Sequence, residues 1–182
     1  MNFNGLFALN LAYNVSAGSV WGHSASRGAI AVAATGAVQN IDGTPNPNHD
    51  IIEPFSSHGP SRVFFASDGT PLPAFLTTRL KPDITATDGT SVTGINFTSP
   101  FYGTSASASA PHAAAIAALL LDANPRLKPH ELEAIMKLTA RERGTPGFDY
   151  IWGFGFVDAL NTTVLARVTG LLGKHDPWWA HH

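Results

Sequence analysis

The sequence contains no cysteine among its 182 residues. This absence excludes a disulfide scaffold, a zinc site built on thiolates and a cysteine nucleophile. Charged residues are also few, at 13%, and the formal net charge is −2. Because no cluster of lysine and arginine stands out, we expect no nucleic-acid partner. None of the eight histidines has the spacing of a zinc motif, so no metal site is predicted from them.

Long apolar runs and targeting signals are missing too. A membrane-spanning helix needs about 20 apolar residues, whereas the longest apolar run covers only residues 113–121. We therefore expect no membrane span. Residues 1–12 are mildly apolar but lack the basic stretch of a signal peptide, so the sequence by itself leaves the compartment open.

The apolar content, at 44%, is that of an ordinary globular protein with one core. Two short apolar runs, at 28–35 and 80–86, are typical of strands in the interior of a sheet, and we predict that they lie beside each other. Between them, residues 62–80 are expected to form an extended excursion with a turn at Asp68-Gly69. Residues 173–182 are expected to be a disordered tail.

Three helices are predicted in the second half of the chain. Residues 105–122 are rich in alanine and apolar on nearly every side, which is typical of a buried helix. The second helix is expected at 129–140, because proline suits its first position and apolar residues recur at helical spacing. The last helix is expected from Asp158 to about Val168, with Asp149 and Asp158 serving turns and caps.

The start of the first predicted helix carries the most informative chemistry. Ser105 follows Gly103-Thr104 at the mouth of this helix, where unpaired N–H groups and the helix dipole can stabilise an oxyanion. Gly103 has no side chain to block the approach of a substrate. The simpler interpretation is that Ser105 only caps the helix, because serine is a common N-cap residue.

Residues 101–112 resemble the serine motif of the subtilisin-like serine peptidases, in which Gly-Thr-Ser is followed by three small residues, Pro-His and an alanine-rich helix. Four more stretches resemble motifs of that family and occur in the family's order. They are the strand at 28–34, FSSHGP at 55–60, KPDITA at 81–86, and the closing stretches at 139–140 and 153–159. Five motifs in order, over residues 14–168, favour Ser105 as a nucleophile over Ser105 as a cap.

The resemblance implies an α/β fold, here a partial doubly wound, mostly parallel sheet with flanking helices. Residues 1–172 would be the C-terminal part of the peptidase domain, with its N-terminal part missing. The implied activity is peptide-bond hydrolysis through an acyl-enzyme, with Ser105 attacking a peptide or protein substrate. The resemblance also implies a secreted or extracellular location. No cofactor is predicted; calcium is an expectation from the family, and no calcium site is identified in this sequence.

The sequence departs from the family pattern in two places. Five residues instead of three separate Ser105 from Pro111, so a count back from Pro111-His112 gives Ser107 as the nucleophile. We predict Ser105, because the Gly-Thr turn exposes its side chain, and keep Ser107 as the alternative. The second departure is larger: the sequence has no Asp-Thr-Gly, no His-Gly-Thr and no Gly-Asn for the oxyanion hole. The base and the aspartate of the triad therefore have no candidate.

Other candidates have plainer interpretations. Residues 22–26 approach the Gly-x-Ser-x-Gly elbow of α/β-hydrolases, with Ser24 attacking as in an esterase, but the fifth residue is serine. His112 is interpreted as a packed, hydrogen-bonded histidine, since a base on the same rigid helix cannot easily swing to Ser105. Turn chemistry, without a metal, explains the aspartates of the turn-rich loops, which are Asp42, Asp50, Asp68 and Asp88.

Three functions therefore stay open at this point. The chain is part of a serine endopeptidase, a catalytically incompetent remnant that binds peptides or a partner, or an unstable truncation without a function of its own. Substrate preference is not predicted, because the segment that lines most of the family's specificity pocket does not occur in this sequence.

Overall fold

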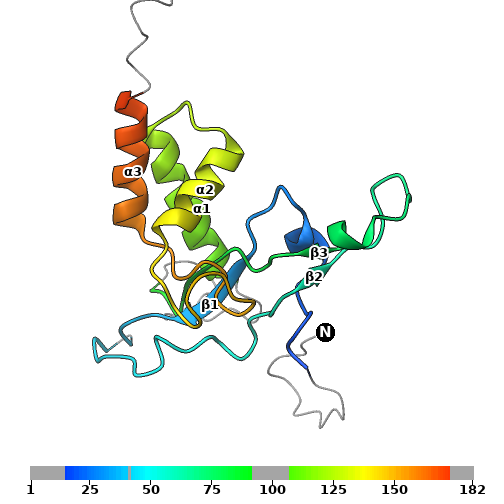
Figure 1. The fold of residues 1–182 in the computed structure, drawn as a ribbon. Helices are drawn as coiled ribbons and strands as arrows, with labels where there is room; N and C mark the ends of the chain where they lie inside the picture. Colours follow the sequence, from blue (N-terminus) through cyan, green and yellow to red (C-terminus); the bar gives the residue numbers. More distant parts are fainter. Residues whose placement is uncertain (1–14, 41, 92–106, 173–182) are drawn as a thin grey trace, which may run out of the picture.

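The structure is a computed structural model that describes residues 15–40, 42–91 and 107–172. Its centre is a parallel pair of strands, β1 (Val32–Gly36) and β4 (Ile84–Asp88), which pair residue for residue from their first to their last members. The prediction that the two apolar runs lie side by side is thereby confirmed. Three α-helices lie together on one side of this pair (Figure 1). A parallel sheet with flanking helices is the partial α/β fold that the sequence predicts.

Both strands begin later than predicted, because side chains bind the backbone that precedes them. The Ala31 N–H donates to Asp83 Oδ2 at 2.7 Å, and Lys81 Nζ donates to the Ala29 carbonyl at 2.6 Å. Pro82 has no N–H to give to a neighbouring strand. The ladder therefore starts only after these residues.

A buried ionic network fixes the start of both strands. Asp83 is 1% exposed, and its Oδ2 lies 2.6 Å from Lys81 Nζ. Its Oδ1 lies 2.6 Å from Lys137 Nζ, which also lies 2.5 Å from a Glu133 carboxylate oxygen. Burial lowers the pKa of Lys137, but the hydrogen bonds to Asp83 and Glu133 outweigh it, and the net pKa is raised. The network joins the start of β4 to helix α2 (Pro129–Thr139).

A short segment extends the sheet on the other side of β4. The Thr85 N–H donates to the Gly155 carbonyl and the Val157 N–H donates to the Thr85 carbonyl, both at 2.9 Å. Phe156 pairs in turn with Arg141. Gly155 has a φ of 112°, and a Cβ on it would lie 2.2 Å from the Arg141 carbonyl oxygen. The closing Gly-x-Gly motif therefore needs glycine so that two backbone segments can approach closely.

We expect Gly155→Ala to destabilise the fold more than Gly147→Ala. Both glycines have positive φ, 112° and 86°, but a Cβ on Gly147 would meet nothing within 4 Å. The change at Gly147 costs only backbone strain, about 1–2 kcal/mol. The change at Gly155 adds an overlap that costs about 1–3 kcal/mol more. Urea unfolding of the two variants measures this difference, and equal losses of stability would contradict the packing argument.

Helix α2 begins and ends close to the predicted positions. Pro129 lies in its first turn, and the Lys128 N–H donates to Glu131 Oε2 at 2.7 Å, which is the glutamate half of a capping box. The apolar face expected from the spacing includes Ile135 and Met136, which are both buried. The helix thus packs the face that its sequence pattern predicts.

Helix α3 (Ala159–Leu172) follows Asp158 directly and is about one turn longer than predicted. Asp158 Oδ1 accepts a hydrogen bond from the Asn161 N–H at 3.0 Å, and Asp158 Oδ2 accepts one from Arg141 Nε at 2.7 Å. The bond from Asn161 and then the one from Arg141 lower the pKa of Asp158. The predicted capping role of Asp158 is confirmed.

Helix α1 (Ser109–Ala123) differs from the prediction in its start and in its burial. It begins at Ser109 rather than at Ser105, which itself lies outside the described residues. Leu120 is fully buried, whereas Leu119 and Leu121 are 50% and 41% exposed. The expectation of a helix buried on all sides is therefore wrong for the described part of the chain. An apolar helix is buried all round only where other elements pack on every side, and in the described part of the chain α1 packs mainly against α3, β4 and β1 and less against α2.

The hydrophobic core lies between the strand pair and the three helices. It is formed by Ile84, Ala86, Ala113, Leu120, Leu132, Ile135, Met136, Val157 and Ala166. Among the described residues, no helix has the length and apolar character needed to cross a membrane.

An arm leaves the amino end of β4 and projects away from the three α-helices (Figure 1). Its elements are β2 (Ser61–Arg62), the 3-10 helix η2 (Ala74–Leu76) and β3 (Thr78–Arg79), with β2 and β3 antiparallel. The predicted turn is at its tip, where Asp68 Oδ1 accepts a hydrogen bond from the Thr70 N–H at 2.9 Å. A second 3-10 helix, η1 (Gly22–Ala25), contacts the base of the arm, since its last carbonyl accepts a hydrogen bond from the Arg79 guanidinium.

Candidate active site

The carboxyl ends of β1 and β4 border a pocket of about 450 Å³. Residues that directly follow the two strands line it, namely 37–40 and 89–91, together with Gly43. This edge of an open α/β sheet is where ligands bind. Among the described residues, the lining offers amides, hydroxyls and backbone groups but no charged side chain. The pocket therefore suits neutral groups that form hydrogen bonds, such as a peptide backbone.

The predicted nucleophile segment connects this edge of the sheet to helix α1. Residues 92–106, which include Gly103 and Ser105, lie outside the described residues. Ser107 is described: it is exposed and lies in the turn directly before Ala108, the N-cap residue of α1. The structure therefore shows where one of the two candidate serines lies with respect to the helix.

The start of α1 is suited to stabilise negative charge. Among the described residues no side chain caps this end, because the N-cap residue is Ala108. Within the described part of the chain, the first N–H groups thus lack the acceptor that a capping serine or aspartate supplies. Ser109 Oγ is fully buried and has no hydrogen-bond partner within the described part of the chain. The sequence did not single out Ser109, because an alternation of serine and alanine does not show which hydroxyl faces the interior.

His112 lies one turn into α1 and is half-buried. Its Nδ1 donates a hydrogen bond to the Ala108 carbonyl at 3.0 Å. The interpretation of His112 as a packed, hydrogen-bonded histidine is confirmed.

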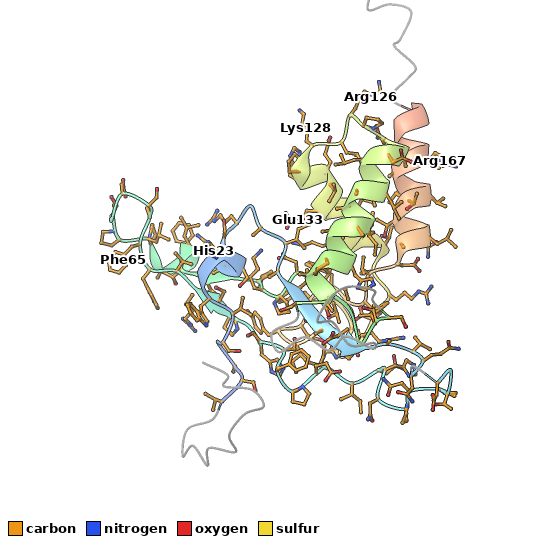
Figure 2. All side chains as sticks on the ribbon, turned by 180° about the vertical axis from the view of Figure 1, so that it is seen from behind. His23, Phe65, Arg126, Lys128, Glu133 and Arg167 are labelled. Carbon is orange, nitrogen blue, oxygen red and sulfur yellow. The ribbon has the colours of Figure 1, made fainter. Side chains whose placement is uncertain are left out.

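The alternative nucleophile, Ser24, lies in η1 beside His23. Ser24 Oγ donates to the Trp21 carbonyl at 2.9 Å, which is a turn contact within the 3-10 helix. A nucleophile elbow needs a strand before the serine and an α-helix after it. The backbone instead becomes extended at Ser26, so the local structure does not fit the α/β-hydrolase interpretation. Figure 2 places His23 at the arm, away from helix α1.

Two carboxylates interact close to the carboxyl ends of the strands. The Glu53 N–H donates to the Ala34 carbonyl at 2.9 Å, which holds Glu53 against β1. Burial and then the charge of Asp88 raise the pKa of Glu53. Asp88 was expected in a loop, but it is the fully buried last residue of β4. Sequence reasoning missed this pair, because strand pairing brings the two residues together and their spacing gives no sign of it.

A second pocket, of about 350 Å³, contains His58. Its walls are mostly apolar and include Ile51, Ile151 and Trp152. Burial lowers the pKa of His58, and the charge of Asp149 only partly offsets this effect. The lowered pKa favours the neutral form of His58.

The other aspartates mostly serve turns, as predicted. Asp42 accepts hydrogen bonds from the Thr44 N–H at 2.9 Å and from its hydroxyl at 2.6 Å. Asp149 Oδ1 accepts bonds from two successive N–H groups at 2.7 Å. Asp50 instead pairs with Arg143 at 3.0 Å. Within residues 15–40, 42–91 and 107–172, no group of three or more acidic or histidine side chains could hold a metal ion, and calcium binding stays a prediction.

Comparisons with known proteins place these features in a family. The model of the subtilase family matches residues 8–155. Among solved structures, the chain is similar to a protease from Pseudoalteromonas arctica PAMC 21717, with 22% identity and a TM-score of 0.48, covering 77% of this chain and 36% of that one. It is also similar to fervidolysin from Fervidobacterium pennivorans, a keratinolytic enzyme related to subtilisin, with 21% identity and a TM-score of 0.45, covering 78% and 20%. The chain thus spans well under half the length of either structure. Curated proteins give no match.

Proposed function

The chain belongs to the subtilase family, and from this premise we propose that it supplies the nucleophile segment of a serine peptidase site that cleaves peptide bonds through an acyl-enzyme. The observation that carries the proposal is the family match over residues 8–155, which contains the whole Gly-Thr-Ser to Pro-His segment. The uncapped start of α1 supports it, because N–H groups at that position can hold a developing oxyanion.

Two serines compete for the role of nucleophile. The Gly103-Thr104 turn favours Ser105, which is our sequence-based choice. The start of α1 favours Ser107, because Ser107 lies one residue before the N-cap and therefore nearest to the uncapped N–H groups. In either case the hydroxyl attacks the substrate carbonyl while a histidine accepts its proton and an aspartate orients that histidine. The sequence offers no motif for these two partners.

A second candidate function rests on the absence of sequence motifs for the histidine and the aspartate of the triad. A member of the family without a base could still bind an extended peptide at the uncharged pocket beside β1 and β4. We therefore keep a catalytically incompetent, peptide-binding remnant as the alternative. In both cases the ligand is a peptide or protein segment. We extend to this chain the secreted location that the family resemblance implies.

A fluorophosphonate probe tests the proposal on this chain combined with the segment that supplies the histidine and the aspartate, in contrast to the isolated 182-residue chain. Such a probe reacts with a serine only where a base activates the hydroxyl. We expect labelling of the unaltered protein and its loss in one of two variants, Ser105→Ala or Ser107→Ala. Loss of labelling in Ser105→Ala supports Ser105, the serine that follows Gly103-Thr104, as the nucleophile. Loss of labelling in Ser107→Ala supports Ser107, the serine nearer to the start of α1. No labelling at all, together with measurable binding of a peptide, would favour the incompetent remnant.

A further inference from the structure

The arm carries more exposed apolar surface than a solvated hairpin needs. Phe64, Phe65 and Phe75 are 53%, 59% and 81% exposed, and Leu80 at its base is 53% exposed. Figure 2 shows Phe65 on the arm, far from the labelled residues of the helices. Clustered exposed aromatic side chains of this kind mark interaction surfaces.

The aromatic side chains do not lie on one face of the arm. Phe64 and Phe65 are neighbours in an extended segment whose partners across the hairpin are Leu72 and Pro71. Successive side chains of extended backbone point to opposite faces. A flat surface such as a lipid bilayer could cover only one of these two rings. An occupant that lies along the edge of the arm can contact both.

The charges of the arm are arranged from base to tip. Arg62 is exposed at the base, and among the described residues no carboxylate pairs with it. Asp68 is exposed at the tip. Phe65 lies midway between them in the sequence, three residues from each. Two arms laid antiparallel, edge to edge, would therefore place Phe65 against Phe65 and each Arg62 next to the Asp68 of the other copy.

We propose that the arm is a homodimerisation element, in which the outer edges of the segment 61–68, which continues β2, lie antiparallel in two copies around a twofold axis near Phe65. The described arm has only two strands, so the β2 edge has no further strand beside it, and an open edge is a template for another strand. A twofold axis brings the same patch of the two copies together, so that the Arg62 of each copy lies next to the Asp68 of the other.

This interface would be small and leave the candidate active site open. An enclosed aromatic side chain buries roughly 150–250 Å², and the three phenylalanines of the arm are only 53%, 59% and 81% exposed before association. The rings of two arms therefore keep the buried area below the lower limit of about 1,200 Å² for stable interfaces. We therefore expect a weak dimer, with a dissociation constant on the order of micromolar. The arm joins the amino end of β4, whereas the 450 Å³ pocket lies at the carboxyl end. This inference does not rest on the proposed peptidase function.

The test is sedimentation velocity of the protein at increasing concentration and low salt. We expect a monomer–dimer equilibrium that Phe65→Ser abolishes. Leu138→Ser is the matched control, because Leu138 is 78% exposed on α2 and lies outside the arm. It should leave the dimer unchanged. A protein that is monomeric throughout, or a dimer that Phe65→Ser leaves intact, would overturn the proposal.

Charge reversal tests the antiparallel arrangement directly. Arg62→Asp and Asp68→Arg should each weaken the dimer, by about tenfold, because each creates two like-charge contacts. An equimolar mixture of the two variants restores both attractive contacts in a heterodimer and should recover the original affinity. Failure of the mixture to recover would refute the arrangement. Vesicles of phosphatidylserine and phosphatidylcholine test for a lipid partner. If the protein stays monomeric, sediments with the vesicles and loses this binding in Phe65→Ser, the dimer proposal is also refuted.

Discussion

Asp83→Ala is expected to lower the free energy of unfolding by about 3–5 kcal/mol, because it leaves the buried ammonium group of Lys81 and the half-buried one of Lys137 without their shared carboxylate. The Lys81 and Lys137 nitrogens both lie 2.6 Å from Asp83 oxygens. Asp83 also accepts the Ala31 N–H at 2.7 Å, so the variant loses a bond that positions β1. A domain with a total stability of about 5–15 kcal/mol loses a large part of it through such a change.

Glu133→Gln is the matched control for Asp83. Glu133 contacts the same Lys137 nitrogen, at 2.5 Å, but its side chain is 23% exposed and Lys137 keeps its bond to Asp83. We expect a loss of about 1 kcal/mol or less, as for other accessible ion pairs. Urea unfolding followed by circular dichroism gives both values. Similar losses for the two variants would show that the network is not centred on Asp83.

Local sequence patterns predicted those features of the fold that depend on nearby residues. The apolar runs predicted β1 and β4, and Asp68-Gly69 predicted the turn of the arm. Pro129 marked the first turn of α2, and Asp158 caps α3 as expected. In each case the physical cause, such as a capping carboxylate or a proline ring, acts within a few residues of its effect.

Features that depend on distant residues could not be predicted in the same way. The Lys-Pro-Asp stretch was noticed as a motif, but its partner Lys137 lies on helix α2, far along the sequence, and no local pattern connects them. The exposure of Leu119 on α1 depends on what packs against that face, which composition does not show. The same holds for the candidate site. The family motif indicated the nucleophile segment, but the start of α1 at Ser109 came only from the structure.

The 182-residue chain by itself is expected to hydrolyse peptides far more slowly than a complete subtilase. A serine hydroxyl is a poor nucleophile without a neighbouring base, and the sequence has no motif for the histidine or the aspartate of the triad. In subtilisin itself, a member of this family, loss of the base alone lowers kcat by roughly 10⁶. Binding and the oxyanion hole then leave about 10³–10⁴ over the uncatalysed rate. Here the oxyanion hole also lacks its usual Gly-Asn side-chain donor, so the expected residual rate is smaller still.

Single-turnover hydrolysis of an activated peptide ester by the isolated chain measures this residual rate. Ser105→Ala and Ser107→Ala serve as controls, and sedimentation confirms that exposed apolar side chains such as Leu119 and Leu121 have not aggregated the sample. We expect the chain and both variants to react at nearly the same slow rate. A fast reaction that either variant abolishes would show that a base is present in this chain. His58 is then the first to replace with alanine, because its lowered pKa favours the neutral form, which can accept a proton.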